Sequence, residues 1–157
     1  MFGTDFYVDR NVPDKDLQCA FAAGFGVDPE EVAVVPETDY EAVGDRWSDL
    51  TVRILLRRSM EAGDFPLALQ ISSRADRPGD LLAVVKTVAR ELGATILTDE
   101  IEAQYDDDFL LVAPSGATAI VTENLDDLDS TEPAIFLTPE SRALYESLVH
   151  RPLVTTG

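Results

Sequence analysis

The chain has 157 residues, 45% of them hydrophobic, and its 30 acidic and 12 basic side chains give a formal net charge of -18. This length suits one domain with its own core, so we expect residues 1–157 to form a single globular domain with the last few residues disordered. The charge excludes nucleic acid and anionic membranes as partners, because both would repel the chain.

Cysteine usage and the apolar pattern indicate the cytoplasm. Cys19 is the only cysteine, which rules out an internal disulfide framework and a multi-thiolate zinc site. No apolar run approaches the roughly 20 residues that span a bilayer. The N-terminus lacks the basic and apolar regions of a secretory signal. We therefore expect a cytoplasmic protein with no membrane attachment.

The N-terminal part predicts a strand, a helix and a second strand. Residues 4–9 alternate polar and apolar side chains as a strand does. Residues 14–24 predict a short helix with acidic side chains in its first turn and Gly24 as its stop. Residues 32–35 predict a short buried strand. Residues 37–49 show no periodicity and predict a loop or one helical turn.

Residues 50–73 predict a hairpin closed by the four-residue link 61–64. This link brings one apolar set into phase across the two strands: Val52, Ile54, Leu56, Met60, Phe65, Leu67, Leu69 and Ile71. The opposite face then carries a polar set: Arg53, Arg57, Gln70 and Ser72. Such a face is typical of a sheet surface exposed to solvent.

Two more helices and a strand follow from the C-terminal half. Residues 76–92 have apolar side chains at helical spacing, with Asp76 as the expected cap and Gly93 as the stop. Residues 94–98 suit a short strand. A last helix is predicted from residue 139, with Thr138 as its cap.

Residues 109–121 predict a second hairpin, in which Gly116 supplies the left-handed residue of a three-residue turn. The resulting register pairs Ala113 with Ala117, Leu111 with Ala119, and Phe109 with Val121. Both faces are apolar, so we expect both strands to lie inside the sheet.

Acidic residues crowd the open end of this second hairpin. Extending the pairing places Asp107 near Glu123 and Asp108 near Thr122. Two acidic runs thus become one patch, the aspartate patch, which consists of Asp106, Asp107, Asp108, Glu123, Asp126, Asp127 and Asp129. Like charges about 4 Å apart cost about 1 kcal/mol per pair even in water. A basic partner would relieve this repulsion.

Together these elements predict an α+β fold. We expect a mainly antiparallel sheet of about five to seven strands with two or three helices packed on it.

Motifs for catalysis are sparse. His150, the only histidine, lies near the end of a predicted helix and favours a helix-terminus role. Cys19 with His150 is a conceivable nucleophile pair, but an alanine-rich helix favours a small buried thiol. Trp47 is expected to pack at the core rim, with a partner anchor as the alternative. We expect no cofactor and lean against an enzyme.

The aspartates also suit metal chemistry. Carboxylate oxygens are calcium ligands, yet the spacing does not match an EF-hand loop, and successive aspartates on a strand point to opposite faces. A cation-dependent hydrolase would use this patch, with Arg53 and Arg57 binding an anionic substrate. A solvated face explains these two arginines equally well.

We therefore expect a non-enzymatic acidic cytoplasmic binding protein that engages a basic protein partner through its acidic C-terminal surface. Small inhibitor or immunity proteins that neutralise basic nuclease-type toxins in bacteria offer a physical analogy of charge and size, without a shared motif. The alternatives are the cation-dependent hydrolase and a housekeeping domain whose acidity is host adaptation. The oligomeric state stays open.

Overall fold

The computed structural model describes residues 1–99, 108–124 and 134–149. The strands are β1 (Phe2–Val8), β2 (Val32–Pro36), β3 (Ile54–Met60), β4 (Ala62–Gly63), β5 (Leu67–Ser73), β6 (Ile96–Thr98), β7 (Asp108–Val112), β8 (Thr118–Thr122) and β9 (Ala134–Ile135). The helices are α1 (Asp14–Phe25), the short 3-10 helix η1 (Pro29–Glu31), α2 (Tyr40–Ser48), α3 (Leu81–Leu92) and α4 (Pro139–Val149).

Seven of these strands form one sheet in the order β2-β3-β5-β1-β6-β7-β8, and β4 pairs separately with β9. Within the large sheet every pairing is antiparallel except that of β2 with β3. This confirms the predicted α+β class and the mainly antiparallel sheet. The described residues hold four α-helices, one more than the two or three expected.

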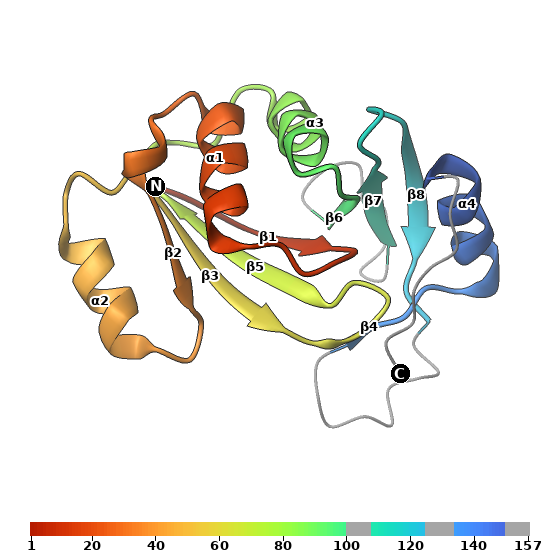
Figure 1. Cartoon of the computed structure of the whole chain (residues 1–157). Coiled ribbons are helices and arrows are strands. Elements are labelled where there is room, and N and C mark those ends of the chain that lie inside the picture. The colour runs from red at the N-terminus through yellow and green to blue at the C-terminus, as the bar shows by residue number, and fades with distance from the viewer. Residues whose placement is uncertain (100–107, 125–133, 150–157) are drawn as a thin grey trace.

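Helices α1 and α3 cover one face of the sheet (Figure 1). The apolar side chains of α3 recur every three or four residues, so one side of the helix is buried. Between this layer and the sheet lies the main core, whose larger members include Phe6, Leu17, Phe21, Leu56, Leu69, Val85, Val88 and Ile96.

The opposite face of the sheet is covered only at its two ends. At one end α2 packs on a small cluster formed by Ala33, Val35, Val52 and Leu55. At the other end α4 and β9 pack on apolar side chains of β6, β7 and β8, which include Leu97, Phe109, Leu111 and Val121. Between these two ends, the polar side chains of Asp5, Arg57 and Gln70 on the central strands β1, β3 and β5 belong to neither apolar cluster.

Helix α2 corrects the prediction of a loop or one helical turn at 37–49. The side chain of Asp39 caps it by accepting a hydrogen bond from the Ala42 amide at 3.0 Å. Only Ala42, Val43 and Trp47 pack toward the sheet, and none of the helix is fully buried. An apolar stripe this narrow leaves little periodicity to detect.

Two helix ends also differ from their predictions. The cap of α3 is Asp80, which accepts a hydrogen bond from the Ala83 amide at 3.0 Å, and not Asp76. Helix α1 continues through Gly24 and ends at the left-handed Gly26. The predicted stop at Gly93 is confirmed, with φ 59°. Thr138 does cap α4, since its hydroxyl accepts from the Ser141 amide at 3.3 Å.

The first hairpin is confirmed with a shifted register. Met60 pairs with Leu67, so the link is residues 61–66 and not 61–64. A shift of two residues leaves every strand side chain on its predicted face, because side chains alternate with a period of two. Val52 and Phe65 lie beyond the strand ends and pack on the opposite face, contrary to the prediction.

The register of the second hairpin is confirmed. Its pairs include Leu111 with Ala119 and Phe109 with Val121, and Gly116 has φ 89°. All of β7 is buried as expected, but β8 is the edge strand of the sheet, and Ile120 is 40% exposed. The apolar character of a strand does not reveal whether another strand lies beyond it.

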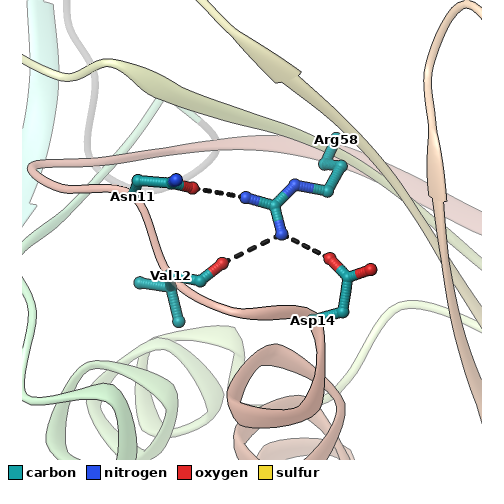
Figure 2. Close-up of polar contacts among 4 residues, drawn as sticks. All are labelled: Asn11, Val12, Asp14 and Arg58. Atoms are coloured by element: carbon teal, nitrogen blue, oxygen red, sulfur yellow. Dashed lines mark hydrogen bonds and ion pairs between the residues drawn. The ribbon is translucent and has the colours of Figure 1, made fainter.

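Arg58 fixes the connection from β1 to α1 (Figure 2). Its guanidinium donates to the Val12 carbonyl at 2.9 Å, bonds the Asn11 side chain and forms an ion pair with Asp14. Asp14 is the first residue of α1, so one arginine on β3 holds the start of this helix. None of the helices in the described ranges has the length and apolar character that a membrane crossing requires.

Gly24 marks a close approach between α1 and α3. A Cβ atom there would lie 2.8 Å from Cγ2 of Val88 and 3.3 Å from Cγ1 of Val84. Both neighbours are β-branched and stiff, so Gly24→Ala should lower the free energy of unfolding by about 1 to 3 kcal/mol in urea titrations. Gly44→Ala is the matched control, because open space surrounds Gly44 in α2. It should stabilise by about 0.5 to 1 kcal/mol. Stabilisation by both substitutions would contradict this packing.

Candidate functional site

The aspartate patch is only partly within the described residues. Asp106, Asp107, Asp126, Asp127 and Asp129 lie outside them, so their proposed convergence stays a prediction. The hydrolase alternative uses the same aspartates and is equally untested.

Asp108 and Glu123 are the two patch residues that the structure describes. Asp108 pairs with Thr122 as predicted, but its side chain is buried and accepts a hydrogen bond from the Thr122 hydroxyl at 3.0 Å. The Asp108 side chain therefore contributes a contact within the sheet and little to an exposed acidic surface. Glu123 is half-buried just beyond β8 and bridges to Leu137.

The uncovered centre of the sheet brings together polar side chains from three strands. Asp5 of β1 pairs with Gln70 of β5, which in turn pairs with Arg57 of β3. One step along, Tyr7 pairs with Ala68, and Ala68 pairs with Ser59. Side chains in such cross-strand rows share one face. We call this surface, formed by Asp5, Tyr7, Arg57, Ser59, Gln70 and Ser72, the open face.

A hollow of about 60 Å³ lies at the edge of the open face. Its polar lining, which we call the acidic hollow, consists of Asp5, Tyr7, Glu37, Ser59, Glu61 and Gln70. Glu37 follows β2, and its amide donates to the Arg58 carbonyl at 2.8 Å, which holds it beside β3. Glu61 follows β3, and its amide donates to the Pro66 carbonyl at 2.7 Å. Strand ends therefore supply both glutamates.

Burial, with the negative charge of neighbouring carboxylates, raises pKa values around the hollow. Burial, together with the charges of Asp5, Glu61, Asp99 and Glu123, raises the pKa of Tyr7 to about 12. The Tyr7 hydroxyl thus stays protonated at physiological pH. Burial raises the pKa of Glu61 as well, and the charges of Glu37 and Asp5 add to this effect. The carboxylates destabilise one another's charged forms.

Chemically, this arrangement suits the binding of cations. Three carboxylates meet a neutral phenol in a shallow space. In the parts of the chain that the structure describes, no group of three or more His, Cys, Asp or Glu side chains is placed to hold a metal ion. A protonated amine or guanidinium is satisfied by such a site without fixed metal geometry.

The predicted arginines occupy different positions. Arg57 projects from the middle of the open face and is half-buried, and its Nε has no hydrogen-bond partner among the described residues. Arg53 is exposed just before β3. Arg57 gives the open face one positive charge beside the acidic hollow. The open face therefore carries charges of both signs, and this arrangement can orient a charged partner.

Three other residues considered for a functional role have structural explanations or stay untested. Cys19 is exposed, which corrects the expectation of a buried thiol, because α1 turns Leu17 and Ala20 toward the core and Cys19 toward solvent. His150 lies outside the described residues. Trp47 packs at the core rim as expected, with the Arg74 guanidinium 4.1 Å from its ring centre.

Sequence reasoning predicted the part of the open face on β3 and β5 and missed the part on β1. The alternation of polar and apolar residues in the first hairpin predicted that Arg57, Gln70 and Ser72 lie on one polar face. Asp5 and Tyr7 alternate with buried residues in the first strand, but nothing local places that strand beside β5.

No family model matches this chain, and neither a curated protein nor a solved structure matches it. The geometry of the open face and the charge of the chain are therefore the basis for a functional proposal.

The raised pKa of Glu61 has a consequence for stability. An acid whose pKa is higher in the folded than in the unfolded state stabilises the fold below its unfolded pKa, and this contribution is lost as pH rises through the folded pKa. Glu61→Gln should therefore raise the melting temperature at pH 7 by about 1 to 3 °C. Near pH 4 the gain should shrink.

Glu146→Gln on the exposed surface of α4 is the matched control for this change. It removes the same charge outside the hollow and should change the melting temperature less at either pH. An equal gain from both variants at pH 7 would show that net charge, and not the hollow, causes the effect.

Proposed function

We propose that this chain is a non-enzymatic acidic binding protein of the cytoplasm that engages a basic protein partner. The partner would contact the acidic hollow, and the contact would extend toward Glu123 and the aspartate patch. The observation that carries this proposal is the gathering of carboxylates around Tyr7 on the part of the sheet face that lies between the clusters under α2 and α4.

Repulsion within the hollow supports the proposal. Displaced pKa values from burial and like charge are concentrated at functional sites. Burial disfavours the charged form of Glu61 and so raises its pKa, and the charges of Glu37 and Asp5 add to this effect. A lysine or arginine side chain placed among the three carboxylates would offset their repulsion, so part of the binding energy would come from relief of repulsion in the free protein.

The polar character of the surface points to a charged partner. The exposed side chains of the open face are charged or hydrogen-bonding, with Asp5 exposed and Gln70 half-buried. An apolar ligand would find no continuous apolar surface there. With a net charge of -18, long-range attraction would also raise the association rate with a basic protein, most strongly at low salt.

An inhibitor or immunity protein is the class that best combines these properties. Its carboxylates would occupy the phosphate-binding cleft of a basic nuclease-type toxin and so block the access of nucleic acid. Size, acidity and an open charged face support this role by physical analogy.

Titration with a ten-residue lysine-rich peptide tests the charge complementarity. Calorimetry at 25 mM and 300 mM NaCl should give a Kd that rises at least tenfold with salt, because about two or more ion pairs are screened. The double variant Glu37→Gln with Glu61→Gln should weaken binding about tenfold at low salt, which corresponds to about 1.4 kcal/mol.

The matched control carries Glu91→Gln with Glu146→Gln. These changes alter net charge equally, but they lie on the exposed surfaces of α3 and α4. Equal weakening by the two double variants would mean that net charge alone attracts the peptide, as host adaptation predicts. No binding at 25 mM NaCl would contradict a basic partner altogether.

A further inference from the structure

Helix α4 lies at the outer side of the sheet, beside the edge strand β8 (Figure 1). Only Ser141 and Tyr145 of its residues are buried, and Leu144 is 45% exposed. Leu148 and Val149 are partly buried against the apolar cluster below. The helix therefore contributes less apolar burial than α3, which buries five residues.

Polar contacts to buried groups hold α4 in place. Nη1 of Arg142 lies 2.8 Å and 3.0 Å from the two carboxylate oxygens of Asp64, whose side chain is fully buried. Ser141 accepts a hydrogen bond from the Thr122 amide at 2.8 Å. One ion pair and one hydrogen bond thus fix the first turns of the helix.

A third contact fixes the middle of α4. The Tyr145 hydroxyl donates to one carboxylate oxygen of Asp9 at 2.6 Å, and the other oxygen accepts from the Thr95 amide at 3.1 Å. The Tyr145 ring also meets the edge of Phe65, with centroids 6.0 Å apart. Asp9 follows β1 and Asp64 follows β4, so the anchors of α4 come from distant parts of the chain.

Water can replace the polar contacts of α4 when the helix opens. Separation of the Arg142–Asp64 ion pair is offset where water also reaches the Asp64 carboxylate, because a charge left buried without its partner is strongly destabilising. When α4 leaves, water can solvate Arg142 and Tyr145. Asp64 keeps a partner, because the Leu137 amide donates to it at 2.9 Å and Leu137 lies before the helix.

The segment before α4 is held independently of the helix. The Asp64 amide donates to the Ile135 carbonyl at 2.7 Å, and the Asn124 amide donates to the Phe136 carbonyl at 2.6 Å. The Thr138 amide donates to the Thr122 carbonyl at 3.0 Å. These backbone bonds can persist while the helix moves.

We infer that α4 is a flap that opens as a unit while the rest of the fold stays intact, with the Arg142–Asp64 ion pair as its latch. Opening uncovers the part of the apolar cluster on β6, β7 and β8 that Tyr145, Leu148 and Val149 cover, while Phe65, Ile135 and Leu137 stay packed on these strands. This surface adjoins the open face through β1, so the flap controls how far an accessible surface extends across the sheet. The inference does not depend on the proposed function.

Residue-resolved amide hydrogen exchange at low urea concentrations tests the flap. Amides of residues 143–149 should exchange at least 100-fold faster than those of residues 85–92 in α3, with rates that depend little on urea. Equal protection of both helices, with the urea dependence of global unfolding, would overturn the inference.

Variants on α4 separate a latch from general destabilisation. Arg142→Gln and Tyr145→Phe should each speed exchange in α4 about tenfold and leave α3 unchanged. Tyr145→Phe removes a single oxygen and retains the buried ring, so the fold should survive. Leu144→Ala, at an exposed position, should leave both helices nearly unchanged. Equal acceleration of α3 and α4, or no acceleration of either, would overturn the latch.

Discussion

The pairing of β1 between β5 and β6 is the constraint on which the structure depends. The first strand of the chain joins two sets of strands, β2-β3-β5 and β6-β7-β8, that otherwise share no pairing in the large sheet. Phe6 and Val8 point into the main core, Asp5 and Tyr7 point to the open face, and Asp9 anchors α4. One strand thus connects the core, the candidate site and the proposed flap.

The unequal covering of the two sheet faces explains where the site lies. Helices α1 and α3 bury most of one face, while α2 and α4 reach only the ends of the other. Polar side chains of the central strands remain accessible between them, and the ends of β2 and β3 add Glu37 and Glu61. The same gap therefore creates both the surface and the repulsion that a basic partner would relieve.

Local patterns predicted most of the elements and not their neighbours. The second hairpin was predicted to the residue because Pro114, Ser115 and Gly116 specify one turn geometry. The register predicted for the first hairpin was wrong by two residues, because its link contains the two-residue strand β4. The partner of β4 is β9, which lies about 70 residues away, and no local sequence signal spans that separation. The sequence of α2 shows no clear helical periodicity, because the helix buries only a narrow apolar stripe.

The candidate site was predictable to a similar extent. Alternation placed Arg57, Gln70 and Ser72 on a polar face, which the structure retains. Strand order brings Asp5 and Tyr7 to that face, and strand order is set by long-range packing that a single sequence does not display. Charge counting directed attention to the aspartate patch, whereas the described carboxylates meet around Tyr7.

The side-chain amide of Gln70 offers the most direct measurement of whether the open face binds a basic partner. It projects beside the acidic hollow, whereas the Gln18 amide lies on α1 and donates to the carbonyls of Pro29 and Val32. In NMR spectra recorded during addition of a lysine-rich peptide, the Gln70 side-chain resonances should shift and saturate while those of Gln18 stay in place. Equal shifts of both amides, or a stationary Gln70 amide, would contradict binding at the open face.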